Sequence, residues 1–390
     1  MDERFLAKRY QNMVESPLSA VSGKAKSYDD LINFGLGDPD LHTDEGIIRY
    51  AFQKALEGHT HYTDPRGMPE LRQEIANYYA KDFGITVDDK EIFVTASASA
   101  AMHIALEAIL NEGEEVIMIS PYFSSYHDQI ILARGVPVEY DTYFEEGFQV
   151  NIERLERCVN EKTRAIIVNT PNNPTGNCLS RKSLEDIASL ARKYDLIVVA
   201  DDIYTIFSYQ EEFIPLMSLE GMRERTITIN SFSKNFLMTG WRLGNVIAPD
   251  YIIHAMRVIN DSIVYSAPSV SQCAGIYALQ HRHEICPPIA EEYRRRLEYA
   301  ANRINSIPNM AVIAPPGGTF YLFVDIRKTN LSSQEVCRIL LEEAHVLTIP
   351  GYGFGRCGEG FLRIACTMGI EKMKEAFDRI EKVSIFQKEN

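Results

Sequence analysis

The stretch Asn230–Gly244 reads NSFSKNFLMTGWRLG and places one lysine, Lys234, in a setting that is unusual for a surface lysine. Two serines precede Lys234, and a tryptophan, an arginine and two glycines follow it, whereas surface lysines usually lie among other charges. The run just before it, Thr226–Ile229, is β-branched and typical of a strand. Lys234 is therefore expected just beyond the end of a strand.

The middle of the chain alternates short apolar runs with helical patterns. The predicted strands are Ile92–Thr95, Val116–Ser120, Ala165–Asn169, Leu196–Ala200 and Thr226–Asn230, with predicted helices at Ala100–Leu110 and Ser183–Lys193. Strands that are apolar along their whole length indicate burial on both faces, and helices between them favour right-handed crossovers. The pattern predicts an α/β fold built on a mostly parallel sheet.

Beyond about residue 285 the pattern changes to that of a smaller α+β domain. Its predicted elements are a charged helix at Ile289–Ile307, a strand at Thr319–Ile326, a helix at Ser333–Ala344, a strand at Phe361–Ala365 and a terminal helix from about Ile370. Because residues 1–45 lack a βα rhythm, we expect them to pack on this domain or on another subunit. We therefore predict a large domain over 46–285 and a small domain formed by 1–45 together with 286–390.

Length and composition are those of an ordinary soluble protein. The chain has 390 residues, of which 45% are hydrophobic and 24% charged, and a domain typically takes about 150 residues. The formal net charge is -14. Nucleic acid and anionic membrane surfaces are therefore poor partners, because an acidic protein repels phosphate groups.

Cysteine usage and the N-terminus favour a cytoplasmic location. The seven cysteines are an odd number without a Cys-x-x-Cys pair, which argues against a disulfide framework or a zinc site. The N-terminal MDERFLAKRY lacks the apolar region of a secretory signal, and no apolar run approaches the roughly 18 residues of a membrane span. The histidine pairs in His59–His61 and His281–His283 lack acid or cysteine partners at ligand spacing, so we expect no metal site.

Polar and aromatic residues follow the predicted strands, where doubly wound sheets bind their ligands. In chain order these residues are Ser97 and Ser99, Tyr122 and Phe123, Asn172 and Asn173, Asp201, Asp202 and Tyr204, and finally Ser231, Lys234 and Arg242. Some also have a simpler interpretation, since Ser97 can cap a helix, Phe123 can pack in the core and Asn173 can form a turn. Asp201 directly follows an apolar strand, and a buried carboxylate there requires a partner.

Together, the five strand ends match the requirements of pyridoxal phosphate. The aldehyde of this cofactor requires a lysine for a Schiff base, and its pyridine nitrogen requires a carboxylate. Its phosphate requires a cationic cradle rich in N–H groups, and its ring requires a stacking face. The sequence therefore predicts a cofactor site centred on Lys234 and Asp201.

Six motifs spread over nearly the whole chain resemble those of the class I/II aminotransferases, which are pyridoxal-phosphate enzymes of fold type I. They are INFGLGDPD (Ile32–Asp40), YTDPRGMPELR (Tyr62–Arg72), NNPTG (Asn172–Gly176), DDIY (Asp201–Tyr204), SFSKNFLMTGWRLG (Ser231–Gly244) and FLRIA (Phe361–Ala365). The resemblance implies a mostly parallel, seven-stranded central sheet with helices on both faces, plus the smaller α+β domain. It also implies a homodimer with composite active sites.

The resemblance further implies roles for individual residues in catalysis and substrate binding. Lys234 would bind the cofactor aldehyde and then carry the proton, while Asp201 would pair with the ring nitrogen. Arg363 would clamp the substrate α-carboxylate, with Asn173 beside it and Gly37 allowing close approach of the backbone.

For the rest of the cofactor, the implied contacts surround the ring and the phosphate. Asn173 and Tyr204 would hydrogen-bond the phenolic oxygen of the ring, and Phe123 would stack on its face. The residues implied at the phosphate are Ser97, Ala98, Ser99, Ser231, Arg242 and, reaching across to the neighbouring subunit, Tyr62.

The implied reaction is a ping-pong transamination between an L-amino acid and a 2-oxo acid, with aspartate, an aromatic or another small amino acid as donor. The segment Asn260–Pro268 has no arginine for a distal carboxylate, and Ser99 stands where another subgroup has a lysine, so aspartate specificity is not implied. A carbon–sulfur β-lyase would use the same cofactor residues and is the alternative. A non-enzymatic effector module would need a basic DNA-binding domain before the motifs, which begin near Ile32.

Overall fold

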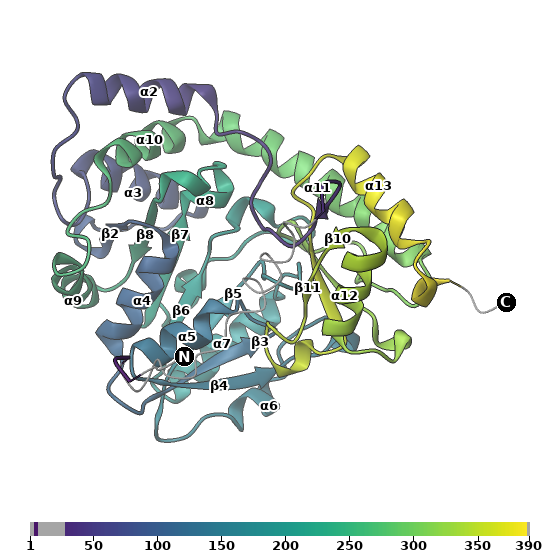
Figure 1. Ribbon diagram of the computed structural model, residues 1–390. Helices are drawn as coiled ribbons and strands as arrows, with labels where there is room; N and C mark the ends of the chain where they lie inside the picture. Colours follow the sequence, from purple (N-terminus) through teal and green to yellow (C-terminus); the bar gives the residue numbers. More distant parts are fainter. Residues whose placement is uncertain (1–3, 7–27, 388–390) are drawn as a thin grey trace.

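A sheet of seven strands lies at the centre of the computed structural model, which describes residues 4–6 and 28–387 (Figure 1). The order across the sheet is β2-β8-β7-β6-β5-β3-β4, and all neighbours are parallel except the two pairs that involve β8. The strands are β2 (Ile92–Thr95), β3 (Glu115–Ser120), β4 (Val136–Asp141), β5 (Thr163–Asn169), β6 (Ile197–Asp201), β7 (Thr226–Ser231) and β8 (Gly244–Ile247). The predicted mostly parallel, seven-stranded sheet is confirmed.

Helices cover both faces of this sheet. Alternating side chains explain why, since Val116 and Met118 of β3 pack with one set of helices while Ile117 and Ile119 pack with another. The first face is covered by α4 (Ala98–Ile109), α5 (Ser125–Leu132) and α9 (Asp250–Asp261), and the second by α7 (Arg181–Lys193) with the short α6 (Ile152–Glu156). A further core joins β2 and β8 to α2 (Glu45–Leu56), α3 (Pro69–Phe83), α8 (Phe232–Asn235) and α10 (Ser269–Gln280).

The C-terminal part of the chain, together with β1 from near the N-terminus, builds two small sheets. One has the order β11-β12-β9, and the other pairs β1 with β10 in parallel. The strands are β1 (Ile32–Asn33), β9 (Tyr321–Asp325), β10 (Val346–Leu347), β11 (Ile349–Pro350) and β12 (Phe361–Ala365), packed with α12 (Ser333–Ala344) and α13 (Ile370–Ile380). Strand β12 and helix α12 have the predicted bounds, and the predicted smaller α+β unit is confirmed as part of the fold.

The long helix α11 (Arg282–Ser306) connects the two parts of the molecule, as Figure 1 shows. Ile289 and Tyr293 belong to the core around α8 and α10, whereas Leu297 and Ile304 belong to the core of the small sheets. The predicted helix began at Ile289, but α11 begins seven residues earlier and contains Pro287 and Pro288 near its start. The predicted domain boundaries remain a prediction, and residues 1–3, 7–27 and 388–390 lie outside the described part of the chain.

Strand ends differ slightly from the sequence prediction, and one difference concerns the site. Strand β6 ends at Asp201 rather than Ala200, because Asp201 still pairs with Asn169 of β5. All seven cysteines are free thiols. Within the described ranges, no helix is long and apolar enough to cross a membrane, and no group of three or more His, Cys, Asp or Glu side chains is placed to hold a metal ion.

Candidate active site

A cavity of about 490 Å³ lies at the carboxyl ends of the central strands, between the large sheet and β12 of the small sheet. It is lined by these predicted residues: Gly37, Ser97, Ala98, Ser99, Phe123, Asn173, Asp201, Tyr204, Ser231, Lys234, Arg242 and Arg363. The fold therefore brings together residues that are more than 320 positions apart in the chain. Of the predicted set, Tyr62 does not line the cavity.

Lys234 lies on the short helix α8, which begins directly after β7. Ser231 caps this helix, because its hydroxyl accepts a hydrogen bond from the Ser233 N–H at 3.1 Å. The Lys234 Nζ donates to the Gly37 carbonyl oxygen at 2.6 Å and lies 5.7 Å from the centre of the Phe320 ring. The amine is thus held inside the cavity by one backbone contact that a reacting group can replace.

Asp201 is buried at the end of β6 and has one free carboxylate oxygen. The hydroxyl of Tyr126 donates a hydrogen bond to Oδ2, while Oδ1 has no partner among the described residues. Burial raises the pKa of Asp201 to about 6, and the hydrogen bonds from Tyr126 and the Ile203 N–H oppose this rise. A buried, unpaired carboxylate oxygen in a cavity favours a ligand with a cationic N–H group.

Arg363 on β12 is buried and held from several sides. Its Nη1 donates to the Asn173 side-chain oxygen at 3.0 Å, and its Nη2 donates to the Gly35 carbonyl at 2.6 Å. The guanidinium also lies over the rings of Tyr321 and Phe354, at 4.7 and 4.9 Å from their centres. Burial lowers its pKa, and its Nε has no partner among the described residues, so a carboxylate in the cavity would find a donor there.

Asn173 is positioned by a chain of amide contacts from neighbouring strands. The Asn169 side chain accepts from the Asn173 N–H and donates to the Asp201 carbonyl, each at 2.8 Å. This network fixes the turn that carries Asn173 relative to both Asp201 and Arg363. Asn169 also lines the cavity, although it is not among the residues predicted from the sequence.

The N-terminus of α4 presents an anion-binding surface to the cavity. Ser97 caps the helix through a 3.1 Å bond from the Ala100 N–H, which confirms the capping interpretation of this residue. The N–H groups of Ala98 and Ser99 occupy the first helical positions, where no bond within the helix is available to them. Arg242 lines the same cavity and is exposed. A cation and free N–H groups therefore line one cavity, an arrangement that suits an anion.

Backbone geometry keeps this helix terminus close to the sheet. Ser97 has a φ of 150°, which a residue with a side chain seldom adopts, and such strain is concentrated at functional sites. Gly244 of β8 faces the same turn, and a Cβ at this position would lie 2.8 Å from the Ala98 nitrogen and 2.9 Å from the Ser97 carbonyl carbon. Only glycine allows the backbone to approach this closely.

Two tyrosines that line the cavity were not predicted from the sequence. Tyr126, described above, is on α5, and its ring meets Phe123 edge-on with centres 5.6 Å apart. Tyr321 begins β9, and its hydroxyl accepts a 3.5 Å hydrogen bond from Tyr204. A Cβ on Gly37 would lie 1.9 Å from the Tyr321 hydroxyl, so glycine at this position is required by Tyr321 whatever the substrate needs.

The remaining candidates lie away from the cavity or serve the fold. Tyr122 donates its hydroxyl to Glu139 at 3.0 Å, and Asn172 accepts from the Thr175 N–H at 3.0 Å, which is a turn contact. Asp202 is fully buried, and burial raises its pKa well above the usual value. Tyr62 is 86% exposed and packs edge-on against Tyr265 with ring centres 5.2 Å apart, so its predicted role in a neighbouring subunit stays a prediction.

Comparison with known proteins matches nearly the whole chain to one family. A family model described as "Aminotransferase class I and II" matches residues 29–380. The chain is 42% identical to an aspartate aminotransferase of Pyrococcus abyssi over 91% of this chain and 92% of that protein. It is 38% identical to the aromatic-amino-acid aminotransferase 2 of Thermococcus litoralis over 97% of this chain and 98% of that protein. The crystal structure of an aromatic aminotransferase from Pyrococcus horikoshii superposes with a TM-score of 0.89 at 40% identity, covering 93% of this chain and 98% of that one.

Proposed function

The chain belongs to the class I and II aminotransferase family, and on this premise we propose that it transfers an amino group from an L-amino acid to a 2-oxo acid in two half-reactions of ping-pong type. The observation that carries the proposal is the arrangement of Lys234, Asp201 and Arg363 around one cavity. Lys234 on α8 supplies an amine, Asp201 at the end of β6 supplies a buried carboxylate, and Arg363 on β12 supplies a guanidinium.

The residues of the cavity fit pyridoxal 5'-phosphate, the cofactor of this family. The free Oδ1 of Asp201 suits a protonated ring nitrogen, and Lys234 suits the aldehyde. The free N–H groups of Ala98 and Ser99, with Arg242, suit the phosphate, and Phe123 offers an aromatic face. When bound, the cofactor supplies a sink for the electron pair left at the amino acid Cα.

We assign the proton transfer to Lys234. Its amine is in the cavity, and the Gly37 carbonyl that accepts its hydrogen bond leaves it one contact to break before it reaches a substrate Cα. A positioned general base of this kind contributes about 10²–10⁴-fold to the rate. Arg363 orients the substrate by its α-carboxylate, and Asn173 and the Gly35 carbonyl hold the guanidinium in place.

For the donor, we propose an aromatic or other apolar amino acid rather than aspartate. Among the described residues, the cations that line the cavity are Lys234, Arg242 and Arg363, and each already has a proposed partner. The lining also includes Leu36, Ile203 and the aromatic rings of Phe123, Tyr126 and Tyr321, which offer contacts to an apolar side chain. Relatives at comparable identity include both an aspartate and an aromatic-amino-acid aminotransferase. Sequence identity therefore does not distinguish the two donor classes, and an activity measurement is required.

The test is a donor screen with the holoenzyme and 2-oxoglutarate, read by release of the donor's 2-oxo acid. We expect phenylalanine, tyrosine or another apolar amino acid to give a higher kcat/KM than aspartate. A clear preference for aspartate would overturn the proposed donor class but not transamination. Release of pyruvate and ammonia from cysteine-type substrates without any 2-oxo acid acceptor would instead support a β-lyase.

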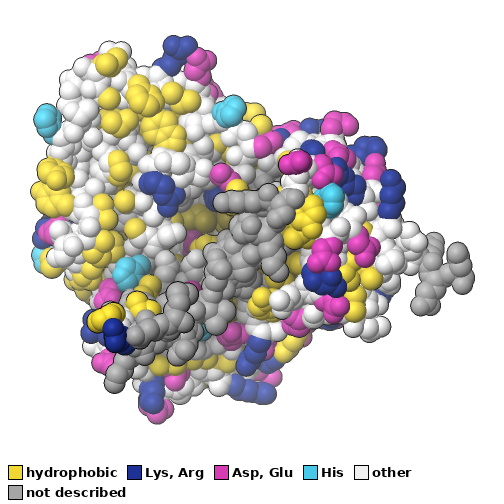
Figure 2. Space-filling model, in the orientation of Figure 1, with side chains coloured by type: hydrophobic (Ala, Val, Ile, Leu, Met, Phe, Trp, Pro, Cys, Tyr) yellow, Lys and Arg dark blue, Asp and Glu magenta, His cyan; other side chains and the backbone are white. Residues whose placement is uncertain are grey.

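We also propose a cytoplasmic homodimer. Large apolar side chains are exposed on the part of the molecule that carries α2 and α9, where Figure 2 shows hydrophobic side chains reaching the surface. They include Phe52, Leu56, Tyr62, Tyr251, Val258, Ile263 and Val264, which are between 40% and 86% exposed. Exposed apolar surface of this kind favours association, and a second copy of the chain is the proposed partner.

A further inference from the structure

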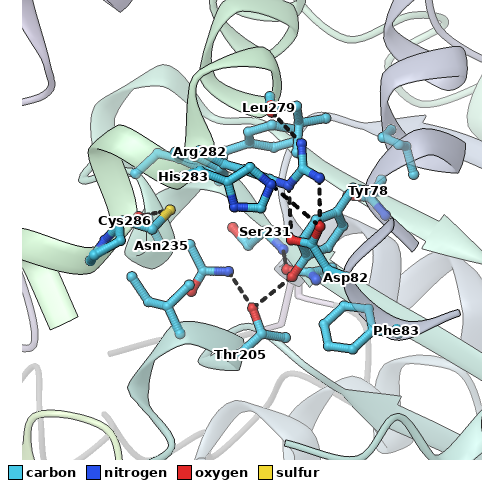
Figure 3. A pocket seen from close by; sticks show the side chains of 17 residues that line it. Tyr78, Asp82, Phe83, Thr205, Ser231, Asn235, Leu279, Arg282, His283 and Cys286 are labelled. Atoms are coloured by element: carbon cyan, nitrogen blue, oxygen red, sulfur yellow. Dashed lines mark hydrogen bonds and ion pairs between the residues drawn. The ribbon is translucent and has the colours of Figure 1, made fainter. Parts of the chain in front are cut away.

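A second cavity has a volume of about 220 Å³ and borders α8, as the candidate active site does. The side chains that line it are drawn in Figure 3. Phe232 and Asn235 of α8 line this second cavity, whereas Ser233 and Lys234 line the first. Its remaining walls come from α3, α10, the start of α11, the segment that follows β6, the end of β7 and the start of β8. We call it the rear cavity.

Much of the lining of the rear cavity is apolar. Ile75 and Phe83 of α3 line it together with Phe232, Phe236 and Leu279. An apolar cavity of about 150 Å³ is large enough to hold benzene in a protein interior. The rear cavity is larger than this, so it has room for a six-membered ring that carries one small substituent.

Two buried amide side chains face this apolar space with unused hydrogen-bonding atoms. Asn235 is 3% exposed and donates its Nδ2 to the Thr205 hydroxyl at 2.7 Å, but its Oδ1 has no partner within the described part of the chain. Asn245 is 4% exposed, and its Nδ2 likewise has no partner there. Both residues line the rear cavity, and each has one buried atom without a partner, an acceptor on Asn235 and a donor on Asn245, which costs stability.

The charged groups around the rear cavity neutralise one another. Arg282 donates its Nε to Asp82 at 2.8 Å, donates its Nη2 to the same carboxylate, and donates its Nη1 to the Leu279 carbonyl at 2.9 Å. Figure 3 shows this pair at one side of the cavity, with His283 beside it and the His283 Nε2 3.8 Å from Asp82. Burial raises the pKa of the Cys286 thiol to about 12, so the thiol is neutral at physiological pH.

We propose that the rear cavity is a binding site for a small uncharged molecule, made of an apolar ring or branched chain and one group that both donates and accepts a hydrogen bond. A hydroxyl or a primary amide meets this description, because it can donate to the Asn235 Oδ1 and accept from the Asn245 Nδ2. The apolar part packs against the phenylalanine and leucine side chains. This proposal does not depend on the reaction proposed above.

The site is placed to influence the candidate active site. Ser231 lines both cavities, and Thr205 of the rear cavity directly follows Tyr204 of the active site. An occupant would therefore contact the opposite side of the two segments that carry Lys234 and Tyr204. We expect occupancy to raise the thermal stability of the protein, because a ligand that binds only the folded state stabilises it.

The test is calorimetric titration of the holoenzyme with three probes of similar size: benzyl alcohol, toluene and benzoate. A saturating non-reactive carboxylate, 3-phenylpropionate, is included to occupy the active site. We expect benzyl alcohol to bind at one site per chain and toluene to bind about tenfold more weakly, because toluene leaves both amides unpaired. Benzoate should bind more weakly still, because it would bury an unpaired charge.

Two variants identify the cavity as the site. Cys286→Phe fills it and should abolish benzyl alcohol binding, while Cys158→Phe, at a partly buried cysteine that does not line it, should leave binding unchanged. Asn245→Leu keeps the Asn235 to Thr205 bond and should reduce the preference for benzyl alcohol over toluene several-fold. If Cys286→Phe does not fold, the Asn245→Leu result decides. A cavity that holds only water, with no saturable binding or with binding unchanged in these variants, would overturn the proposal.

Discussion

At the scale of single residues, Asp201 is the group whose environment most constrains the chemistry. The carboxylate is buried, Tyr126 donates to Oδ2, and Oδ1 is left without a partner in the described part of the chain. This arrangement raises the pKa of Asp201 to about 6 and makes its charged form costly without a cationic ligand. Two predictions follow from these contacts.

Tyr126→Phe should weaken cofactor binding and shift its pH dependence. The Tyr126 hydroxyl lowers the pKa of Asp201, so removing it should raise that pKa further above its usual value. The loss of cofactor affinity on acidification should then begin at a higher pH than in the wild type, and the dissociation constant at pH 7.5 should rise about tenfold. Equilibrium titration of the apoprotein between pH 5 and 8 measures both effects.

Tyr122→Phe is the matched control for this experiment. Tyr122 lies just before α5, but its hydroxyl donates to Glu139 and it does not line the cavity. Its removal should leave cofactor affinity unchanged. Superimposable pH profiles for Tyr126→Phe and the wild type would show that the hydroxyl does not act on Asp201.

Asp201→Asn should stabilise the cofactor-free protein at neutral pH. The folded-state pKa of Asp201 is raised from 3.8 to about 6, so its contribution to stability is complete below 3.8 and is lost as the pH rises through 6. The shift of about two pH units corresponds to about 3 kcal/mol. Asparagine has no such loss, so the advantage of the variant should grow between pH 4 and pH 7.5.

Denaturant unfolding of the two apoproteins across this pH range measures that difference. With the cofactor bound the order should reverse, because the wild type gains an ion pair that asparagine cannot make. A difference in unfolding free energy that stays constant with pH would mean that Asp201 is not a buried, raised-pKa acid.

Sequence patterns selected the side chains that are proposed to carry the chemistry but not those that position them. Lys234, Asp201 and Arg363 each lie within motifs or beyond predicted strands, and the fold brings all three to one cavity. Tyr126 and Tyr321 were missed because their positions depend on the register of α5 and on a strand of the small sheet. Such contacts between distant segments leave no local pattern in the sequence.

At the scale of elements, the N-terminus of α4 and strand β8 form one unit. Strand β8 runs antiparallel to β2 and β7, and its first residue, Gly244, pairs with both Thr95 and Ser231. The turn at Ser97 is strained, and the backbone of β8 lies directly against it. The proposed phosphate site thus depends on how closely a strand and a helix can approach.

Gly244→Ala should disturb that approach. The added Cβ would meet backbone atoms of Ser97 and Ala98, which cannot rotate away as a side chain would. We expect the unfolding free energy to fall by about 1–3 kcal/mol and the dissociation constant for inorganic phosphate in the apoprotein to rise. Gly369→Ala is the control, since a Cβ there meets nothing within 4 Å. Wild-type phosphate affinity in Gly244→Ala would contradict the role of this contact.

Element prediction succeeded where strands are apolar throughout and failed where they are not. Strands β2, β3, β5, β6 and β7 are almost wholly buried and were found within two residues of their true ends. Strand β4 is at the edge of the sheet and half-exposed, with Pro137 and Glu139 in it, so it lacks the buried pattern. Strand β8 is only four residues long and begins with Gly244 and Asn245, which are poor strand formers.

At the scale of the whole molecule, the proposed dimer would bring Tyr62 to the active site of the other subunit. In the single chain Tyr62 is 86% exposed and lies outside the active-site cavity. Its ring packs against Tyr265, which is itself exposed and directly follows the exposed Ile263 and Val264 in the chain. An exposed tyrosine among apolar neighbours is consistent with burial on association.

A hybrid dimer tests this directly. Tyr62→Phe should raise the cofactor dissociation constant about tenfold, through loss of one hydrogen bond to a charged group. A hybrid dimer then combines one Tyr62→Phe subunit with one Lys234→Ala subunit. If Tyr62 acts across the interface, one of its two sites contains both Lys234 and Tyr62 and should recover wild-type affinity. Tyr265→Phe should leave affinity unchanged. Hybrids without any wild-type site would place Tyr62 in the active site of its own subunit, and an unchanged dissociation constant in the Tyr62→Phe homodimer would place it in neither site.

The most direct test of transamination through Lys234 is a mass balance on the holoenzyme. A reactive L-amino acid is supplied with 2-oxoglutarate, and 2-oxo acid, glutamate and ammonia are measured together for the wild type and Lys234→Ala. We predict one glutamate for each 2-oxo acid released, no ammonia, no continued turnover without 2-oxoglutarate, and almost no turnover in Lys234→Ala. Ammonia release without an acceptor, or a Lys234→Ala variant that turns over at the wild-type rate, would contradict it.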